Sequence, residues 1–301
     1  MKYRISHRTW YDYSELAPVC HNLVHLAPRT TPHQKCSGYR LKIDPTPAFL
    51  TYRDDYFGNR TEYFSIEGAH RRLEIVAESI VEILPIVAQR KDPLPWEDCV
   101  IQQANLDGRK SDGIAHEIFE PIHWQLMYPS PRVPAIPALC DYAASSFLPG
   151  RSIVEALSDL TARIHGDFQF DLRATTVDTP LADVLQHRRG VCQDFAHLAT
   201  GCLRTLGLAA RYTSGYLRTM PPPGKARLIG TDASHAWCSC WCGPLGWIDF
   251  DPTNNCLAND SYVTLAWGRD YGDVCPIQGV FVGGGEHRIG VSVDVSPNTT
   301  G

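Results

Sequence analysis

The chain has 301 residues, of which 44% are hydrophobic and 20% charged, so it is long enough for one large globular domain or two ordinary ones. Its formal net charge of -5 argues against a basic footprint, and we expect neither nucleic acid nor a membrane surface as a partner. The opening residues lack the apolar stretch of a signal peptide, and no segment offers the roughly 18 apolar residues of a spanning helix. The eleven cysteines, an odd number, fit a reducing compartment, and we expect a cytoplasmic protein.

Residues 1–91 alternate between apolar and polar side chains in short runs, which is the pattern of half-buried strands. Turn-forming residues separate the runs, as in Asp44-Pro45-Thr46-Pro47 and across 54–59. Short strands joined by tight turns predict an N-terminal β-sandwich-like domain over 1–91. The expected strands are 3–7, 22–28, 39–43, 61–66 and 72–77.

Residues 92–150 are rich in proline, and the prolines alternate with short segments of helical pattern. We interpret 92–150 as a connector with short helices.

The last region, 151–301, has helices first and strands afterwards. Ser152 and Glu155 fit a capping box ahead of apolar residues at helical spacing. Thr179-Pro180 fits a second helix start, with the helix over 181–187. Alternating segments follow at 209–217, 234–242 and 246–251. This order predicts an α+β fold, with helices packed on an antiparallel sheet and further strands at the C-terminal end.

Cys192 heads an amphipathic segment that follows two arginines and Gly190. The unpaired N–H groups at a helix start and the positive end of the helix dipole stabilise a thiolate over a thiol. Apolar residues then recur at helical spacing from Phe195 to Leu206, and Gly207 is a natural stop. The sequence therefore predicts a reactive cysteine at the start of a buried helix.

His235 and Asp251 lie on consecutive predicted strands joined by the turn 242–246. In a hairpin the start of one strand lies opposite the end of the next, so these two side chains can meet across the ladder. A carboxylate on one imidazole nitrogen leaves the other free to take the proton of a cysteine. Asp249, on the same strand face, is the alternative carboxylate.

Three motifs resemble the transglutaminase-like superfamily, specifically bacterial transglutaminase-like proteins with an N-terminal β-domain. They are Gly190-Val191-Cys192-Gln193-Asp194-Phe195-Ala196-His197, Ser234-His235-Ala236-Trp237 and Gly246-Trp247-Ile248-Asp249-Phe250-Asp251-Pro252-Thr253. The segments 3–9, 55–59 and 268–274 are also similar to that family, so the resemblance spans nearly the whole chain.

The resemblance implies a transglutaminase or papain-like core over 151–301 and acyl transfer through a thioester. It implies Cys192 as nucleophile, His235 as general base and then acid, and Asp251 as the residue that orients His235. The expected substrate is a peptide or protein amide. The enzyme would be a peptidase or amidase, or an acyltransferase if an amine rather than water resolves the thioester. No calcium-loop spacing occurs in the sequence, and we expect no metal and no cofactor.

The backbone N–H of Cys192 is the expected oxyanion donor. The upstream tryptophan donor of animal enzymes has no assigned counterpart here. Gln193 stands where the animal motif has tryptophan, which argues against assuming protein cross-linking.

Simpler roles are expected for the other reactive side chains. Cys238, Cys240 and Cys242 alternate along a straight strand, which spreads them too far for one tetrahedral zinc ion, and core packing is expected for them. We expect His197 and Asp194 to be structural. The alternative for the whole chain is a binding module that retains the fold without catalysis.

Overall fold

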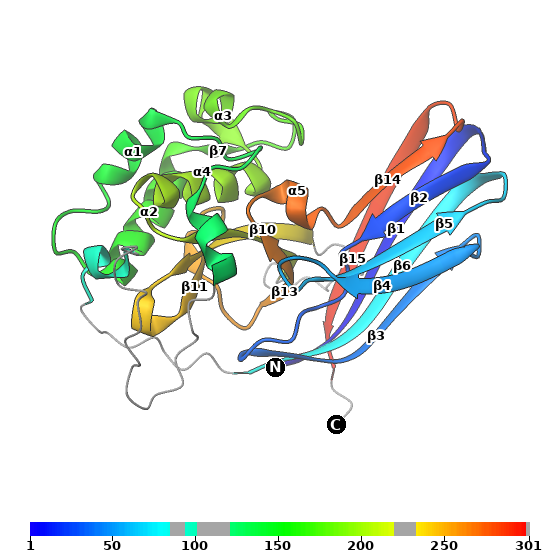
Figure 1. Ribbon diagram of the computed structural model, residues 1–301, viewed down its shortest axis with the longest axis horizontal. Helices are drawn as coiled ribbons and strands as arrows, with labels where there is room; N and C mark the ends of the chain where they lie inside the picture. The colour runs from blue at the N-terminus through cyan, green and yellow to red at the C-terminus, as the bar shows by residue number, and fades with distance from the viewer. Residues whose placement is uncertain (85–93, 101–120, 220–232, 299–301) are drawn as a thin grey trace, which may run out of the picture.

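The computed structural model describes residues 1–84, 94–100, 121–219 and 233–298, and these residues form a helix-rich part beside a sandwich of strands (Figure 1). The end of the expected N-terminal domain and part of the expected connector, residues 85–93 and 101–120, lie outside the described residues. Among the described residues, no helix combines the length and the apolar composition needed to cross a membrane.

The sandwich contains two four-stranded sheets. The first has the order β15-β1-β6-β3, and the second has the order β14-β2-β5-β4. Every pairing in the two sheets is antiparallel. The strands are β1 (Lys2–Ala17), β2 (Val19–Val24), β3 (Gln34–Asp44), β4 (Phe49–Asp54), β5 (Arg60–Ile66), β6 (His70–Ile83), β14 (Ile277–Val282) and β15 (His287–Pro297).

The sandwich confirms the β-rich fold expected for the N-terminal residues, with some differences in the strands. The expected strand 22–28 is instead β2, which ends at Val24. The strand β4 was not expected, because all of its residues are exposed and its sequence lacks the alternation that marks one buried face.

The last two strands of the chain lie in the sandwich. β15 pairs with β1 from Tyr3↔Pro297 to Tyr13↔His287, and β14 pairs with β2. The sequence grouped these residues with the region 151–301, whereas their hydrogen bonds join them to the N-terminal strands. Alternation predicts which face of a strand is buried, but it does not name the neighbouring strand.

The helix-rich part has an antiparallel sheet of order β12-β11-β10-β9-β13. Its strands are β9 (Ala210–Leu217), β10 (Ala233–Trp241), β11 (Trp247–Asp251), β12 (Cys256–Leu257) and β13 (Tyr262–Gly268). Helix α4 (Cys192–Thr205) contacts β10 and β9, and α1 (Pro137–Ala144), α2 (Ile153–Asp167) and α3 (Leu181–His187) contact α4. This arrangement confirms the α+β class.

Two short elements and several turns of helix complete this part. Strands β7 (Gln169–Phe170) and β8 (Arg189–Gly190) form a parallel pair just before α4. The 3-10 helices Trp96–Cys99 and Pro121–Met127 and helix α1 supply short helices in the region predicted as a connector. The short helix α5 (Tyr271–Val274) follows β13 and leads into β14.

Two predicted helix starts differ in detail. Helix α2 begins after Ser152, as expected, but the Ser152 side chain makes no capping hydrogen bond. Helix α3 covers Leu181–His187, as expected, but Pro180 rather than Thr179 is its cap residue, and the Thr179 hydroxyl accepts from the N–H of Thr176. At the start of α2 the Ile153 N–H donates to the distant Leu94 carbonyl at 2.9 Å, whereas the Thr176–Thr179 hydrogen bond before α3 is local.

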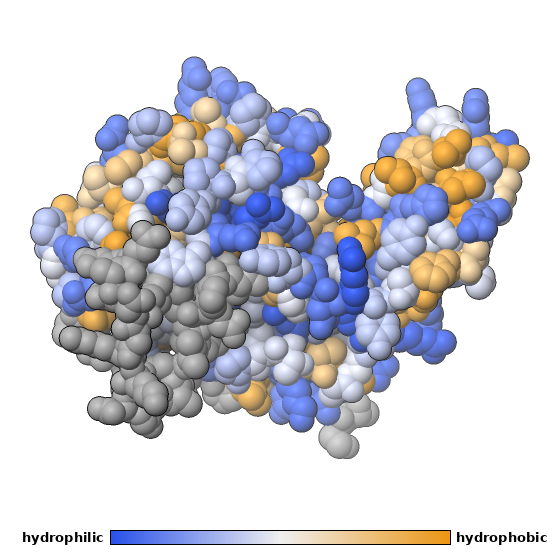
Figure 2. All heavy atoms as spheres, in the orientation of Figure 1, coloured by the Kyte–Doolittle hydropathy of each residue, from blue (hydrophilic) through white to orange (hydrophobic). Residues whose placement is uncertain are grey.

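Two apolar cores hold the molecule together. One lies between α4, its neighbouring helices and the sheet β9 to β11. The other fills the sandwich and also includes Tyr216 from β9 and Val263 and Leu265 from β13. The sheet of the helix-rich part therefore packs against the sandwich as well as against α4. Apolar side chains also gather on the surface of the sandwich where β14 lies, and among them are the exposed Val280, Phe281 and Val282 (Figure 2).

Candidate active site

Cys192 is the first residue of α4, as the sequence predicts. Val191 precedes the helix in an extended conformation, and the Cys192 side chain is partly buried. Helix α4 is buried along most of its length, and Gly207 follows it with a φ of 78°, the left-handed conformation that commonly ends helices. The position gives the Cys192 sulfur both the positive end of the helix and access to solvent.

Asp194 and Gly190 hold the start of α4 in place. The Asp194 carboxylate accepts hydrogen bonds from the Val191 N–H at 2.8 Å and from the Thr175 hydroxyl at 2.6 Å. A Cβ atom on residue 190 would lie 2.6 Å from Asp194 Oδ2, so this close approach requires glycine. Burial raises the pKa of Asp194, although both hydrogen bonds lower it. Asp194 is structural, as expected, and the glycine is needed for space.

His235 lies near the start of β10 and joins the cysteine to a carboxylate. Its Nε2 and Asp251 Oδ2 are 2.7 Å apart, and Cys192 is the second group that acts on its imidazole. Because Nε2 is taken by Asp251, Nδ1 is the nitrogen that remains for the sulfur. Burial lowers the pKa of His235, but the hydrogen bonds and charges of Asp251 and Cys192 raise it to about 10. The pair therefore favours an imidazolium beside the sulfur.

Asp251, at the end of β11, is fully buried, and its carboxylate accepts hydrogen bonds from other groups besides His235. Its Oδ2 accepts hydrogen bonds from the Asn254 amide at 2.6 Å and the Tyr262 hydroxyl at 2.7 Å. Its Oδ1 accepts from the Thr253 N–H at 2.8 Å. Burial raises the pKa of Asp251, yet these bonds and the charge of His235 lower it overall.

The sequence analysis missed Asn254 and Tyr262. Asn254 follows Asp251 in a turn-forming run, which is a weak signal because Asn is common in any turn. Tyr262 lies on a different strand, β13, and its hydroxyl reaches Asp251 only because β13 and β11 belong to one sheet. Nothing in the local sequence marks that contact.

Asp249, the alternative carboxylate, binds other side chains. It accepts hydrogen bonds from Trp237 Nε1 at 3.2 Å and from the Ser239 hydroxyl. Ser239 is the direct cross-strand partner of Asp249, which precedes Asp251 by two residues on β11. The structure thus brings Asp251, rather than Asp249, to His235.

The remaining reactive residues have structural surroundings. Cys238, Cys240 and Cys242 are fully buried in the core beneath α4, and burial raises the pKa of each thiol. His197 is buried and accepts a hydrogen bond from the Tyr271 N–H at 3.1 Å, and burial lowers its pKa to about 3. A neutral, hydrogen-bonded His197 is a structural residue, as expected.

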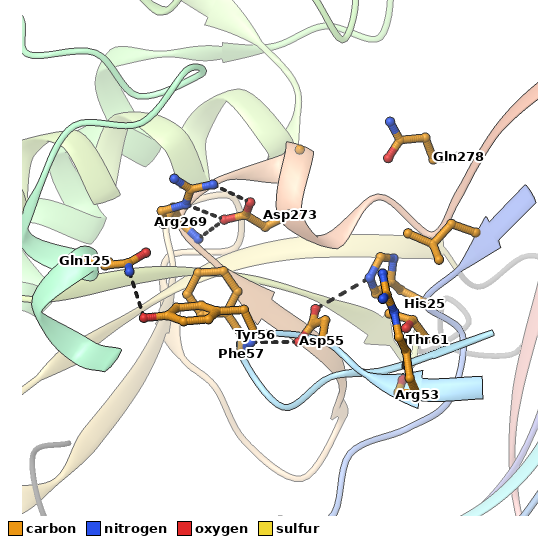
Figure 3. A pocket seen from close by; sticks show the side chains of 12 residues that line it. His25, Arg53, Asp55, Tyr56, Phe57, Thr61, Gln125, Arg269, Asp273 and Gln278 are labelled. Atoms are coloured by element: carbon orange, nitrogen blue, oxygen red, sulfur yellow. Dashed lines mark hydrogen bonds and ion pairs between the residues drawn. The ribbon is translucent and has the colours of Figure 1, made fainter. Parts of the chain in front are cut away.

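A polar cavity of about 340 Å³ lies apart from this site, between the turn after β4 and helix α5 (Figure 3). Two pairs of its titratable side chains contact each other. Arg269 donates two hydrogen bonds to Asp273 at 2.9 Å, and the Nε2 of His25 lies 3.7 Å from Asp55. Asp55 also accepts from the Phe57 N–H. The Gln125 amide donates to the Tyr56 hydroxyl at 2.7 Å, and this hydrogen bond joins the helix-rich part to the sandwich at the cavity.

Two family models match the chain. The model of the bacterial transglutaminase-like N-terminal region matches residues 3–82, and that of the transglutaminase-like superfamily matches residues 143–252. The second match contains Cys192, His235 and Asp251.

Relatives cover almost the whole chain. An uncharacterized protein of Mycobacterium tuberculosis is 41% identical over 98% of this chain and 93% of its own length. One of Mycobacterium leprae is 29% identical over 97% of this chain and 98% of its own length. A protein-glutamine gamma-glutamyltransferase of Pseudomonas aeruginosa is 30% identical over 40% of this chain and 18% of its own length.

A solved structure shares the fold. It is described as "a Putative Cysteine Protease from Cytophaga hutchinsonii", and it aligns with a TM-score of 0.74 at 19% identity. The alignment covers 100% of this chain and 92% of the other. At this identity the likeness concerns the fold alone.

Proposed function

Since the chain belongs to the transglutaminase-like superfamily, we propose that it is a cysteine-dependent enzyme that cleaves amide or peptide bonds through a thioester on Cys192. In this proposal Cys192 is the nucleophile, His235 the general base and acid, and Asp251 the residue that orients His235. One observation carries it: the Nε2 of His235 lies 2.7 Å from the buried carboxylate of Asp251, and Cys192 at the start of α4 acts on the same imidazole and raises its pKa.

The reaction begins with His235 holding the proton of Cys192. The sulfur attacks the carbonyl carbon of the amide, and a tetrahedral oxyanion forms. The carbon–nitrogen bond then breaks, the leaving amine takes the proton from His235, and the acyl group remains as a thioester. Water, activated by the now neutral His235, attacks the thioester and releases the acid and the Cys192 thiol. This sequence makes the enzyme a peptidase or amidase.

Asp251 keeps the imidazole in the tautomer and orientation that this cycle needs. The Nε2–H of His235 donates to Asp251 throughout, so Nδ1 alone exchanges the proton with the sulfur and the amine. Asn254 and Tyr262 donate to the same carboxylate oxygen and fix its direction. They act through Asp251 and are therefore positioning residues.

The start of α4 also supports stabilisation of the oxyanion. In the first turn of a helix the backbone N–H groups have no carbonyl partner within the helix, and the dipole favours negative charge. The N–H of Cys192 is the donor that we assign. Removing one such donor elsewhere costs about 3–4 kcal/mol of transition-state stabilisation.

Alkylation and mass spectrometry test the proposal. Iodoacetamide should modify Cys192 before the other ten cysteines, because Cys192 is partly exposed and interacts with His235, whereas burial raises the pKa of thiols such as Cys202 and Cys238. His235→Ala should slow the modification of Cys192. The matched control His187→Ala removes an exposed histidine from α3 and should leave the rate unchanged.

A screen of peptide and isopeptide amides, with and without an added amine, then identifies the reaction. We expect a Cys192 acyl adduct in the mass spectrum and acid as the product, and Cys192→Ala should abolish both without unfolding the chain. Full turnover by Cys192→Ala, or equal alkylation rates in the wild type and His235→Ala, would refute the mechanism and leave the alternative of a non-catalytic binding module.

A further inference from the structure

A second cavity, of about 520 Å³, lies between the sandwich and the helix-rich part of the molecule. Strand β15 supplies Ile289, Val291 and Val293 to one wall. Ser234 from the start of β10 and Tyr271 from α5 line it from the other side. The cavity is thus built by both halves of the fold, and neither half forms it alone.

This cavity begins beside the proposed catalytic residues. Ser234 immediately precedes His235 on β10, but consecutive side chains of a strand point to opposite faces, so Tyr271 is the residue that links the cavity to the site. Tyr271 packs, together with Cys192, against the small apolar cluster of Tyr212, Ala236, Ala266 and Val274. A group attached to an amide at Cys192 therefore has this cavity as a neighbour.

The wall formed by β15 is apolar but uncovered. Ile289, Val291, Val293 and Val295 alternate along β15 and so share one face. Val293 and Val295 are 1% and 0% exposed, because the sandwich covers them, whereas Val291 and Ile289 on the same face are 52% and 57% exposed. Two β-branched apolar side chains thus face the cavity without being buried by the chain itself, and a bound apolar group would remove them from water.

The cavity is also electrically neutral. None of the described residues that line it is Lys, Arg, Asp or Glu. Its histidine, His7, is hydrogen-bonded through Nδ1 to the Tyr216 hydroxyl at 2.9 Å and through Nε2 to the Thr9 hydroxyl at 2.9 Å. Burial lowers the pKa of His7 to about 4, so it is uncharged at neutral pH. A charged ligand would find no counter-ion here, in contrast to the cavity of Figure 3, which Arg53, Asp55 and Arg269 line.

We propose that the cavity lined by Ser234, Tyr271 and the exposed end of β15 binds an uncharged apolar side chain of the substrate, next to the amide that Cys192 attacks. The inference rests on the proposed function and adds the substrate class: amides flanked by a bulky aliphatic or aromatic group. Ile289 and Val291 are then the specificity-determining residues.

Alkylating reagents of matched reactivity test the proposal without a known substrate. The full-length protein is treated with iodoacetamide, N-hexyl iodoacetamide and an analogue of the same length that ends in a carboxylate, and modification of Cys192 is followed by mass spectrometry. We expect the hexyl reagent to modify Cys192 at least about tenfold faster than iodoacetamide, and the carboxylate analogue to show no such gain. Each rate is divided by the rate with free cysteine.

Val291→Asp and, independently, Ile289→Asp should lower the ratio of the hexyl rate to the iodoacetamide rate to the ratio found with free cysteine. Both residues are half exposed, so the variants are expected to fold, and circular dichroism checks this. Val280→Asp changes a valine that is 68% exposed on β14 outside the cavity, and it should keep the preference.

The outcomes separate the two proposals. Rapid modification by iodoacetamide without a preference for the hexyl reagent, or a preference that survives in both β15 variants, would overturn the substrate assignment and leave the nucleophile intact. Failure of all three reagents to modify Cys192 would overturn the proposed function and the substrate assignment together.

Discussion

At the scale of single residues, the proton on His235 is the main electrostatic feature of the site. Asp251 is buried, its pKa is lowered, and its Oδ2 lies 2.7 Å from the Nε2 of His235. The pKa of His235 is raised from 6.5 to about 10. An imidazolium that is stable at neutral pH can protonate a leaving amine, and it should lose this ability as the pH rises through about 10.

The raised pKa also predicts how stability depends on pH. A histidine whose pKa is higher in the folded state stabilises the fold fully below its unfolded pKa of 6.5 and loses that contribution as the pH rises towards 10. The wild type should therefore lose free energy of unfolding relative to Asp251→Asn between these pH values. Chemical denaturation at about pH 6, 8 and 10 measures the difference. Parallel pH profiles, or a His235 imidazole that titrates near its ordinary pKa by NMR, would contradict the assignment.

At the scale of the element, the start of α4 depends on a tight turn. Gly190 closes β8, Val191 is extended, and the Asp194 carboxylate bonds back to the Val191 N–H. A Cβ atom on residue 190 would lie only 2.6 Å from the Asp194 carboxylate. The turn therefore requires the glycine and the aspartate, and it places Cys192 at the start of α4.

Gly190→Ala should disturb this turn. The added Cβ would lie 2.6 Å from Asp194 Oδ2, and we expect a loss of about 1–3 kcal/mol in the free energy of unfolding together with slower alkylation of Cys192. Gly166→Ala in α2 is the matched control, since nothing lies within 4 Å of its Cβ position, and it should be neutral or stabilising by up to about 1 kcal/mol. Thermal and chemical denaturation measure both. Equal effects of the two substitutions would show that the turn is not tight.

At the scale of the whole molecule, strands from the two ends of the chain pair with each other. β15 forms the edge of the sheet that contains β1, and its Val293 and Val295 belong to the sandwich core. That core continues into β9 and β13 of the helix-rich part. The C-terminal strands therefore complete the sandwich and also form one wall of the cavity beside the site.

A charge in this core should unfold the sandwich. Val295→Asp places a carboxylate at a position that is 0% exposed, and we expect a loss of more than about 3 kcal/mol in the free energy of unfolding, because an unpaired buried charge costs several kcal/mol. Val282→Asp, at a valine that is 63% exposed on β14, should change stability by less than about 0.5 kcal/mol. Urea denaturation followed by circular dichroism compares them. Similar stabilities of the two variants would argue against a core that depends on β15.

The sequence by itself determined the local features of this protein. Helical spacing placed Cys192 at a helix start, alternation marked most of the strands, and the hairpin spacing brought Asp251 within reach of His235. These features follow from the chain's own periodicity and turn chemistry, which act over a few residues. The resemblance of three motifs to one superfamily then gave the fold class.

Only the tertiary structure decided which distant groups meet. It pairs β15 with β1 and brings the Tyr262 hydroxyl to Asp251. Asp249 binds Trp237 and Ser239, and Asp251 is the carboxylate that contacts His235. It also left Ile289 and Val291 uncovered beside the site. The physical reason is that periodicity tells which face of an element is buried, whereas the partner of that face is chosen by packing between segments far apart in the chain.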